Sequence, residues 1–317
     1  MSAPTGIIQR AAAPFAGAVN RARLGLPRHF FESTGLLGDD LMCSAVFREL
    51  KKRGGRKIAF ATQHGALFKN NPDVDRLIGH SSAGLAQWGQ LGLPVKPLTY
   101  TRYDAMRDYD TPPDEHALIK MFRAAGVGGP VELRPYLFLT AQEFAAGKLG
   151  DHQVVIQSSN ASSTQAMRNK EWYPARFQEV CSELRLDLTV IQLGSVDDPK
   201  LEGAKDLRGK TSLREAAAIL ANSLVFVGLV SFLMHLARAV DCRSVIIYGG
   251  REKPSQTGYV ANKNLYSQVR CAPCWLRNPC DFDRKCMDMI TPQHVIAAAA
   301  EQIARYGTLL DVQTAQL

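Results

Sequence analysis

The sequence predicts an α/β protein built from two parallel-sheet domains, and three observations indicate this fold class. Residues 224–250 contain an apolar β-branched run, a glycine, a short amphipathic stretch and a second apolar run, which is the order of a parallel strand–helix–strand unit. Residues 29–52 show the order of strand, glycine turn and helix near the start of the chain. The chain has 317 residues, of which 46% are hydrophobic, and this is enough for two substantial cores.

The chain divides most simply at residues 141–151, where Gly147 and Gly150 mark a boundary. We therefore expect an N-terminal arm at residues 1–28, a first domain at 29–150 and a second domain at 151–317. The expected strands include residues 29–32, 57–62, 153–157, 188–193, 224–227 and 244–248, and the expected helices include 39–52, 116–125 and 175–184.

The charge of the chain and its distribution indicate which class of ligand or partner the protein binds. The net charge is +8 and the pI is about 9.2, but Lys and Arg are spread along the chain without a block of five or six. This pattern favours a polyphosphate ligand or an anionic lipid surface over nucleic acid. No apolar run is long enough for a transmembrane helix, and residues 1–27 lack the continuous apolar core of a secretion signal. We expect a cytoplasmic protein, with peripheral contact at the inner membrane left open.

The unit at residues 224–250 is the first candidate site. Ser231 is placed to cap its helix, and His235 falls in about the first turn, where free backbone N–H groups and the helix dipole favour phosphate. The plain alternative is a buried strand–helix–strand unit, in which a lone histidine near a helix start is usually structural.

Polar residues at two other strand ends also suggest a site. Asp39 begins a helix after a strand and a glycine turn, so it either lies at the cleft edge of the sheet or simply caps the helix. Ser158 and Ser159 open a hydroxyl-rich loop after the expected strand 153–157. Such a loop either donates to phosphate oxygens or is an ordinary solvated turn.

Four of the seven cysteines lie within sixteen residues, at Cys271, Cys274, Cys280 and Cys286. Thiolates at this spacing are typical of a structural zinc site, and iron accepts the same ligands. Disulfides or free thiols are the alternatives, although a reducing cytoplasm disfavours stable disulfides.

Several short motifs, taken in their order, resemble one known family. The chain from about residue 30 to residue 303 is similar to the bacterial heptosyltransferases of glycosyltransferase family nine. The resembling motifs are Leu37-Gly38-Asp39-Asp40-Leu41, Asn71-Pro72-Asp73-Val74-Asp75-Arg76, Lys170-Glu171-Trp172-Tyr173-Pro174, Gly209-Lys210-Thr211-Ser212-Leu213 and Met234-His235-Leu236-Ala237. The resemblance implies the GT-B architecture, in which two Rossmann-like domains face a central cleft.

The resemblance also implies roles for individual residues. Asp39 takes the place of the catalytic base, and Lys170 that of the lysine that contacts the donor diphosphate. Ser231, Met234 and His235 match the donor-binding segment, and an acid near Asp197 holds the nucleotide ribose in the family. Some members that modify proteins bind iron at the cysteine segment. Val230 and Phe232 stand where the family has an acid and a glycine.

The implied function is inverting transfer of a sugar without a catalytic metal. The first candidate is heptose from ADP-heptose, passed to a saccharide in lipopolysaccharide or O-antigen biosynthesis or to a protein hydroxyl. The alternative is a catalytically inactive relative that serves as a metal-stapled binding or assembly module. Val230 and Phe232 favour this alternative, whereas Asp39 and Lys170 favour the enzyme.

Overall fold

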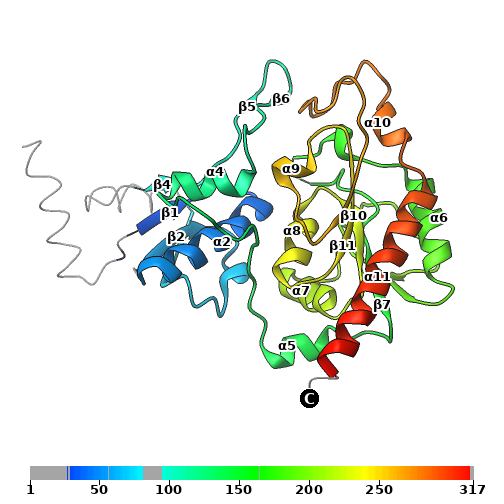
Figure 1. The fold of residues 1–317 in the computed structure, drawn as a ribbon, viewed down its shortest axis with the longest axis horizontal. Coiled ribbons are helices and arrows are strands. Elements are labelled where there is room, and N and C mark those ends of the chain that lie inside the picture. The colour runs from blue at the N-terminus through cyan, green and yellow to red at the C-terminus, as the bar shows by residue number, and fades with distance from the viewer. Residues whose placement is uncertain (1–26, 28, 56, 81–94, 164, 315–317) are drawn as a thin grey trace, which may run out of the picture.

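The computed structural model describes residues 27, 29–55, 57–80, 95–163 and 165–314. The arm expected at residues 1–28 therefore lies outside the described residues, apart from residue 27. The described chain forms two lobes, each containing one parallel sheet, and α5 (Ala141–Ala146) lies on the connection between them (Figure 1). We call residues 29–140 the first lobe and residues 147–314 the second lobe. The predicted α/β class with parallel sheets is confirmed.

The sheet of the first lobe has the strand order β3-β2-β1-β4, with all neighbours parallel. Strand β2 is buried at every position, as expected for a strand covered on both faces. Phe47 of α2 packs between Phe31 and Phe60, with ring centroids 5.7 and 5.0 Å away. The elements of this lobe are β1 (His29–Glu32), α2 (Leu37–Gly54), β2 (Ile58–Thr62), η1 (Gly65–Phe68), β3 (Arg76–Gly79), β4 (Lys96–Pro97), β5 (Tyr103–Asp104), β6 (Tyr109–Asp110) and α4 (Ala117–Ala124).

Helix α2 starts at Leu37, two residues before the predicted start at residue 39. Its N-cap residue is Leu36, whose side chain makes no cap hydrogen bond. Asp39 and Asp40 consequently lie in the first helical turn, where the positive end of the helix dipole favours carboxylates. The reading of Asp39 as a simple helix cap is therefore wrong.

The sheet of the second lobe has the strand order β12-β11-β10-β7-β8-β9, and it is parallel throughout. The chain runs from β7 toward one edge and then returns to the other side of β7, so β7 and β10 flank the topological switch point. Ligands of open parallel sheets bind at the carboxyl ends of the strands at such a point. The elements of this lobe are β7 (Gln153–Ile156), η2 (Arg168–Lys170), α6 (Pro174–Leu184), β8 (Thr189–Gln192), β9 (Lys205–Asp206), α7 (Leu213–Ala221), β10 (Phe226–Leu229), α8 (Phe232–Ala239), β11 (Ser244–Gly249), α9 (Pro254–Thr257), β12 (Lys263–Tyr266), α10 (Lys285–Asp288) and α11 (Pro292–Thr314).

Two local predictions in the strand–helix–strand unit need correction. Strand β10 runs through Gly228 to Leu229 and does not end at the glycine. Ser231 occupies the N-cap position of α8, but its hydroxyl makes no cap bond and donates instead to Gln157 Oε1 at 2.7 Å. The free N–H groups at the start of α8 are therefore not used by this side chain.

The connection between the lobes is held on both sides by Arg214 of α7. Its guanidinium donates to both carboxylate oxygens of Glu143 in α5, at 2.6 and 2.7 Å, and to the carbonyl of Phe138 at 2.7 Å. It also donates to the carbonyls of Ala66 and Lys69 in the first lobe, at 3.1 and 3.4 Å. One buried cation thus joins the second lobe, the connection and the first lobe.

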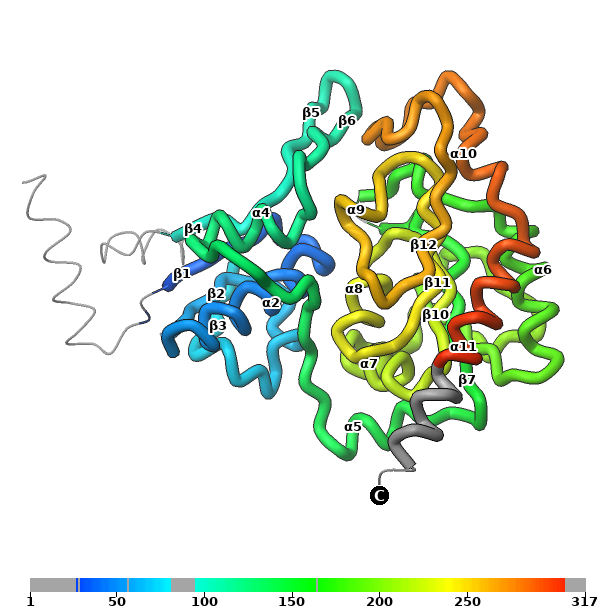
Figure 2. The backbone as a smooth tube through the Cα atoms, viewed as in Figure 1, coloured from blue at the N-terminus to red at the C-terminus, as the bar shows by residue number. Residues whose placement is uncertain are grey.

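The lobes also meet at the opposite end of the molecule. Strands β5 and β6 form an antiparallel hairpin that reaches from the first lobe toward the cysteine-rich loop at residues 271–286 (Figure 2). An antiparallel bridge between Tyr109 and Leu276 joins the hairpin to that loop. The second lobe is thus in contact with the first at both ends.

Candidate active site

A hollow of about 540 Å³ is lined by residues of both lobes. The first lobe contributes the first turn of α2 and the turn after β2. The second lobe contributes the loop after β7, the start of α8 and the segment after β11, all at carboxyl ends of strands. The hollow therefore lies at the switch point, where the sheet topology expects a ligand. It brings together four residues predicted from the sequence, namely Asp39, Lys170, Ser231 and His235.

Asp39 is the carboxylate on the first-lobe wall. Only 7% of the residue is exposed, and its Oδ2 accepts a hydrogen bond from the hydroxyl of Thr34. Burial, partly opposed by this hydrogen bond, raises the pKa of Asp39 to about 6. A carboxylate with such a pKa is largely ionised at neutral pH and is well matched to accept a proton.

Asp40, the next residue, has a different role. It is fully buried and accepts hydrogen bonds from the hydroxyls of Ser33 and Thr62 and from Nδ1 of His64, the last at 2.9 Å. Asp40 does not line the hollow, whereas His64 does. The carboxylate of Asp40 therefore fixes the strand ends and the His64 ring around the site, and it is not available to a substrate.

Lys170 lies on the second-lobe wall at the end of η2. Its Nζ is 2.8 Å from Oε1 of Glu252, and its side chain is 17% exposed. Burial lowers the pKa of Lys170, while the neighbouring Glu252 carboxylate acts in the opposite direction. Although burial acts to raise it, the cations of Lys170 and Arg251 lower the pKa of Glu252 to about 2. The two groups form an ion pair that faces the hollow.

His235 lies beside the first turn of α2. A Cβ at Gly38 would be 3.2 Å from Cδ2 of His235, so the missing side chain of Gly38 allows this approach. The Nδ1 atom of His235 is 2.6 Å from the hydroxyl of Tyr259, and burial lowers the pKa of His235 to about 3. The imidazole is therefore neutral and can contribute a hydrogen bond, but not a positive charge, to a phosphate.

Four of the predicted donor-binding residues do not line the hollow. The hydroxyl of Ser158 donates to the carbonyl of Pro199 at 2.6 Å, and that of Ser159 donates to Glu171 at 2.7 Å. Both hydroxyls are therefore used within the fold. The other two are Met234, which is fully buried, and Asp197, which is exposed to solvent outside the hollow.

Sequence reasoning missed other residues of the site. Asn160, Ser162 and Ser163 of the hydroxyl-rich loop line the hollow in place of the two serines before them. Glu252 and Tyr100 also line it. A sequence signal for Glu252 was present, because it lies only two residues after the Gly249-Gly250 pair at the carboxyl end of β11.

The cysteine-rich loop lies away from this hollow. Cys271, Cys280 and Cys286 line a separate hollow of about 510 Å³, and Cys274 is partly buried. The four thiols have the chemistry of a zinc or iron site. Among the residues that the structure describes, however, no three His, Cys, Asp or Glu side chains are arranged to hold a metal ion.

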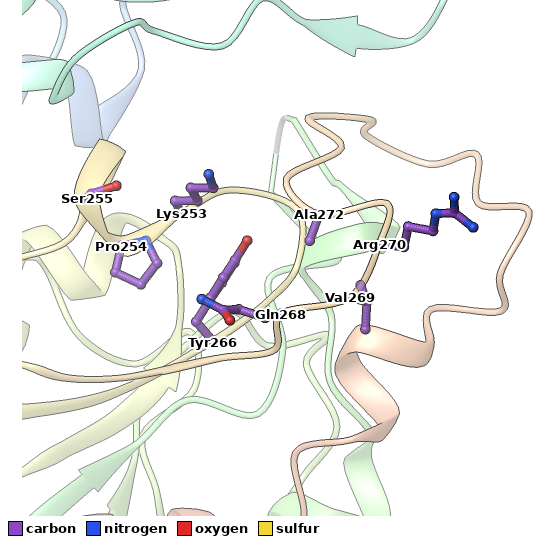
Figure 3. Close-up of a pocket in the computed structure, with 8 residues that line it drawn as sticks. All are labelled: Lys253, Pro254, Ser255, Tyr266, Gln268, Val269, Arg270 and Ala272. Carbon is purple, nitrogen blue, oxygen red and sulfur yellow. The ribbon is translucent and has the colours of Figure 1, made fainter.

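A third hollow, of about 590 Å³, lies where the chain leaves β12, beside Lys253 and Arg270 (Figure 3). Figure 3 shows the guanidinium of Arg270 pointing away from Lys253. The two cations do not converge on one point, so this hollow lacks a shared cationic site for a phosphate.

In the described part of the chain, no helix is both apolar enough and long enough to cross a membrane.

Comparison with known proteins finds a family match that lies mostly in the second lobe. Residues 132–284 match the model of glycosyltransferase family 9 (heptosyltransferase). The predicted resemblance to glycosyltransferase family 9 is confirmed. The matched segment contains Lys170, His235 and the first three cysteines of the cysteine-rich loop, while Asp39 lies before it and Cys286 after it. No curated protein matches the sequence.

Solved structures of bacterial glycosyltransferases share the fold at low sequence identity. ADP-heptose lipopolysaccharide heptosyltransferase II of E. coli is 15% identical, with a TM-score of 0.65, over 88% of this chain and 100% of that one. The family 9 glycosyltransferase of Veillonella parvula is 17% identical, with a TM-score of 0.66, over 87% and 97%. The iron-containing dodecameric glycosyltransferase TibC of enterotoxigenic E. coli is 18% identical, with a TM-score of 0.66, over 88% and 79%. The GT-B architecture is therefore confirmed.

Proposed function

We propose that this protein is an inverting glycosyltransferase that moves heptose from ADP-heptose to an acceptor hydroxyl. The observation that carries this proposal is the meeting of Asp39 and Lys170 on opposite walls of one hollow at the switch point. The family match supports sugar transfer. The name of the E. coli ADP-heptose lipopolysaccharide heptosyltransferase II supports ADP-heptose as donor and a lipopolysaccharide saccharide as acceptor. A protein hydroxyl is the other acceptor class that we propose.

The chemistry follows from the two walls. Asp39 takes the proton from the acceptor hydroxyl while that oxygen attacks the anomeric carbon from the face opposite the diphosphate. The new carbon–oxygen bond forms as the bond to the diphosphate breaks, which inverts the anomeric centre. Lys170 and the N–H groups at the start of α8 stabilise the negative charge that gathers on the departing diphosphate.

Release of ADP from ADP-heptose tests this proposal. The assay contains the purified chain, ADP-heptose and deacylated lipopolysaccharide core, and mass spectrometry follows the acceptor. We expect acceptor-dependent ADP release together with a mass increase of one heptose. ADP release without acceptor modification would mean hydrolysis, and no release with any core or protein acceptor would contradict transfer.

A binding or assembly module is the second candidate function. Val230 and Phe232 line the hollow with apolar side chains where the family has an acid and a glycine.

Because the side chain of Val230 cannot accept a hydrogen bond, we expect modest nucleotide affinity. The change Val230→Asp is expected to tighten ADP binding or to change the preferred base. Calorimetry with ADP, UDP and GDP checks this. Tight, ADP-selective binding by the unmodified chain would contradict it, and absence of any nucleotide binding would favour the module.

We further propose a structural zinc or iron at Cys271, Cys274, Cys280 and Cys286, in line with the iron named for TibC. Binding would require the loop to draw the four sulfurs together, since the structure does not present them as a ligand set. Elemental analysis of protein prepared without chelator is expected to find about one metal per chain, and the Cys271→Ser/Cys274→Ser variant is expected to lose it. Metal-free wild-type protein would contradict this site.

Peripheral contact with an anionic membrane belongs to the same proposal, because the chain has a net charge of +8. Co-sedimentation is expected with vesicles that contain anionic lipid and to be lost at high salt. Equal sedimentation with neutral vesicles would contradict an electrostatic contact.

A further inference from the structure

A chain of alternating charges runs from the cysteine-rich loop to the active-site lysine. Arg277 donates to both oxygens of Asp110, at 2.7 and 3.0 Å, and Arg251 donates to the same carboxylate. Arg251 also donates to Oε1 of Glu252 at 2.9 Å, and Lys170 lies 2.8 Å from that same oxygen. The order is therefore Arg277, Asp110, Arg251, Glu252 and Lys170.

The middle of this charge chain is removed from water. Asp110, Arg251 and Glu252 are 3%, 1% and 2% exposed. A buried charge is tolerated when it is paired and hydrogen-bonded, and the loss of one partner leaves the other uncompensated. Arg251 holds both carboxylates, and its guanidinium lies over the ring of Trp275, 5.1 Å from the centroid. The position of Glu252 therefore depends on Arg251, which in turn is held by Asp110.

The charge chain joins the two lobes. Asp110 belongs to the β5–β6 hairpin of the first lobe, whereas its partners come from the second lobe. Arg277 also stacks on Tyr103 of the hairpin at 3.7 Å, and Asn278 donates to Asp108 at 2.7 Å. Figure 2 shows the hairpin next to the cysteine-rich loop. The hairpin thus supplies a carboxylate that organises cations around the donor side of the site.

We propose that Asp110 and Arg251 are positioning residues that act through Glu252 to hold Lys170 ready for the donor diphosphate. This inference rests on the proposed function, in which Lys170 contacts the diphosphate. A lysine ammonium has three donors. One is used by Glu252. Fixing Glu252 therefore directs the ammonium and leaves donors for phosphate oxygens in the hollow.

The change Asp110→Asn distinguishes a positioning role of Asp110 from an effect of its charge alone on nucleotide binding. It removes one negative charge near Lys170, so an account based on net charge predicts tighter binding of an anionic nucleotide. The positioning account predicts weaker binding of ADP. Arg251 loses an anionic partner and shifts toward Glu252, its remaining one, so that Glu252 no longer keeps the ammonium of Lys170 in place. The two accounts differ in sign.

The experiment is calorimetric titration of ADP into four proteins: wild type, Asp110→Asn, Lys170→Ala and the double variant. We expect ADP to bind Asp110→Asn roughly tenfold more weakly than wild type, the scale of one charge-assisted hydrogen bond. In the Lys170→Ala background the same change is expected to have less than about a twofold effect, because its target is already absent. A structural defect unrelated to Lys170 would give equal losses in both backgrounds.

Asp108→Asn is the matched control. Asp108 lies on the same hairpin and bonds Tyr103 and Asn278, but it does not contact Arg251 or Glu252 among its hydrogen bonds in the described residues. Its ADP affinity is expected to stay within about twofold of wild type. If Asp110→Asn does not fold, Arg251→Lys replaces it, since lysine keeps the charge but cannot span two carboxylates. The same weakening is expected.

The outcomes separate this inference from the proposed function. Unchanged or tighter ADP binding by Asp110→Asn, or an equal loss in the Lys170→Ala background, overturns the positioning role while leaving the transferase proposal in place. Absence of ADP binding by the wild-type chain overturns both. Roughly tenfold weaker binding that vanishes in the Lys170→Ala background supports the inference.

Discussion

The two walls of the active-site hollow hold their ionisable groups in opposite ways. On the first-lobe wall, Asp39 is buried against the neutral hydroxyl of Thr34, and its pKa rises to about 6. On the second-lobe wall, Lys170 is paired with Glu252, which is itself paired with Arg251. The comparison shows how one hollow can present a proton acceptor on one side and a fixed cation on the other. The first group suits proton transfer, and the second suits charge recognition.

The largest expected effect comes from removing the proton acceptor on the first-lobe wall of the hollow. Asp39→Asn keeps the size of the side chain but cannot take a proton. A general base typically contributes about 100- to 10,000-fold, so turnover is expected to fall by that order while ADP affinity changes by less than about twofold. Initial rates of ADP release and calorimetry give the two values. Near-normal turnover would move the base elsewhere, with His64 as the next residue to test, because Asp40 is buried away from the hollow.

Removing the cation on the second-lobe wall is expected to change ADP affinity as well as turnover. Lys170→Ala removes the proposed contact to the diphosphate. Because this contact would exist both before and during transfer, ADP affinity and turnover should fall together. A loss of roughly 10- to 100-fold in ADP affinity is the scale of a charge-assisted hydrogen bond. The matched control is Lys200→Ala, a lysine of the same lobe that lies outside the hollow and pairs with Glu202. Loss of turnover with unchanged ADP affinity would show that Lys170 acts only in the transition state.

The smallest expected effect is a change in the free energy of unfolding that depends on the ionisation of Asp39. The raised pKa of Asp39 means that the folded chain keeps this proton between about pH 4 and pH 6, where the unfolded chain has released it. Stability therefore falls as pH rises through this window. Asp39→Asn should recover on the order of 1–3 kcal/mol at about pH 7 and little below about pH 4.

Urea unfolding of both proteins at the two pH values measures this difference, with Asp197→Asn as an exposed-acid control. An equal gain at both pH values would show that the cost of Asp39 is steric and does not arise from ionisation.

Sequence reasoning named residues that line the hollow where their chemistry coincides with a local pattern. Asp39 and His235 each follow a strand and lie near a helix start, and this arrangement is encoded within a few residues. Ser158 and Ser159 do not line the hollow, because the direction of their side chains depends on distant partners, Pro199 and Glu171. The loop was predicted correctly, but which of its hydroxyls line the hollow was not.

The long-range contacts could not be predicted from one sequence. Asp110 and Arg251 are 141 residues apart in the chain, and no periodicity or motif connects them. The four cysteines lie close together in the sequence and their spacing indicates metal chemistry, but in the described residues their side chains are not arranged as a ligand set. Local pattern fixes the strand ends, and tertiary packing decides which side chains meet there.

Arg214 also constrains how the hollow can open. It belongs to α7 of the second lobe and lies at one end of the molecule, where it is bonded to the connection and to carbonyls of the first lobe. A rigid separation of the lobes would break all of these bonds at once, whereas a rotation about Arg214 preserves them. Arg214 would be the pivot of such a rotation, which at the far end would have to part Asp110 of the β5–β6 hairpin from Arg251 and Arg277.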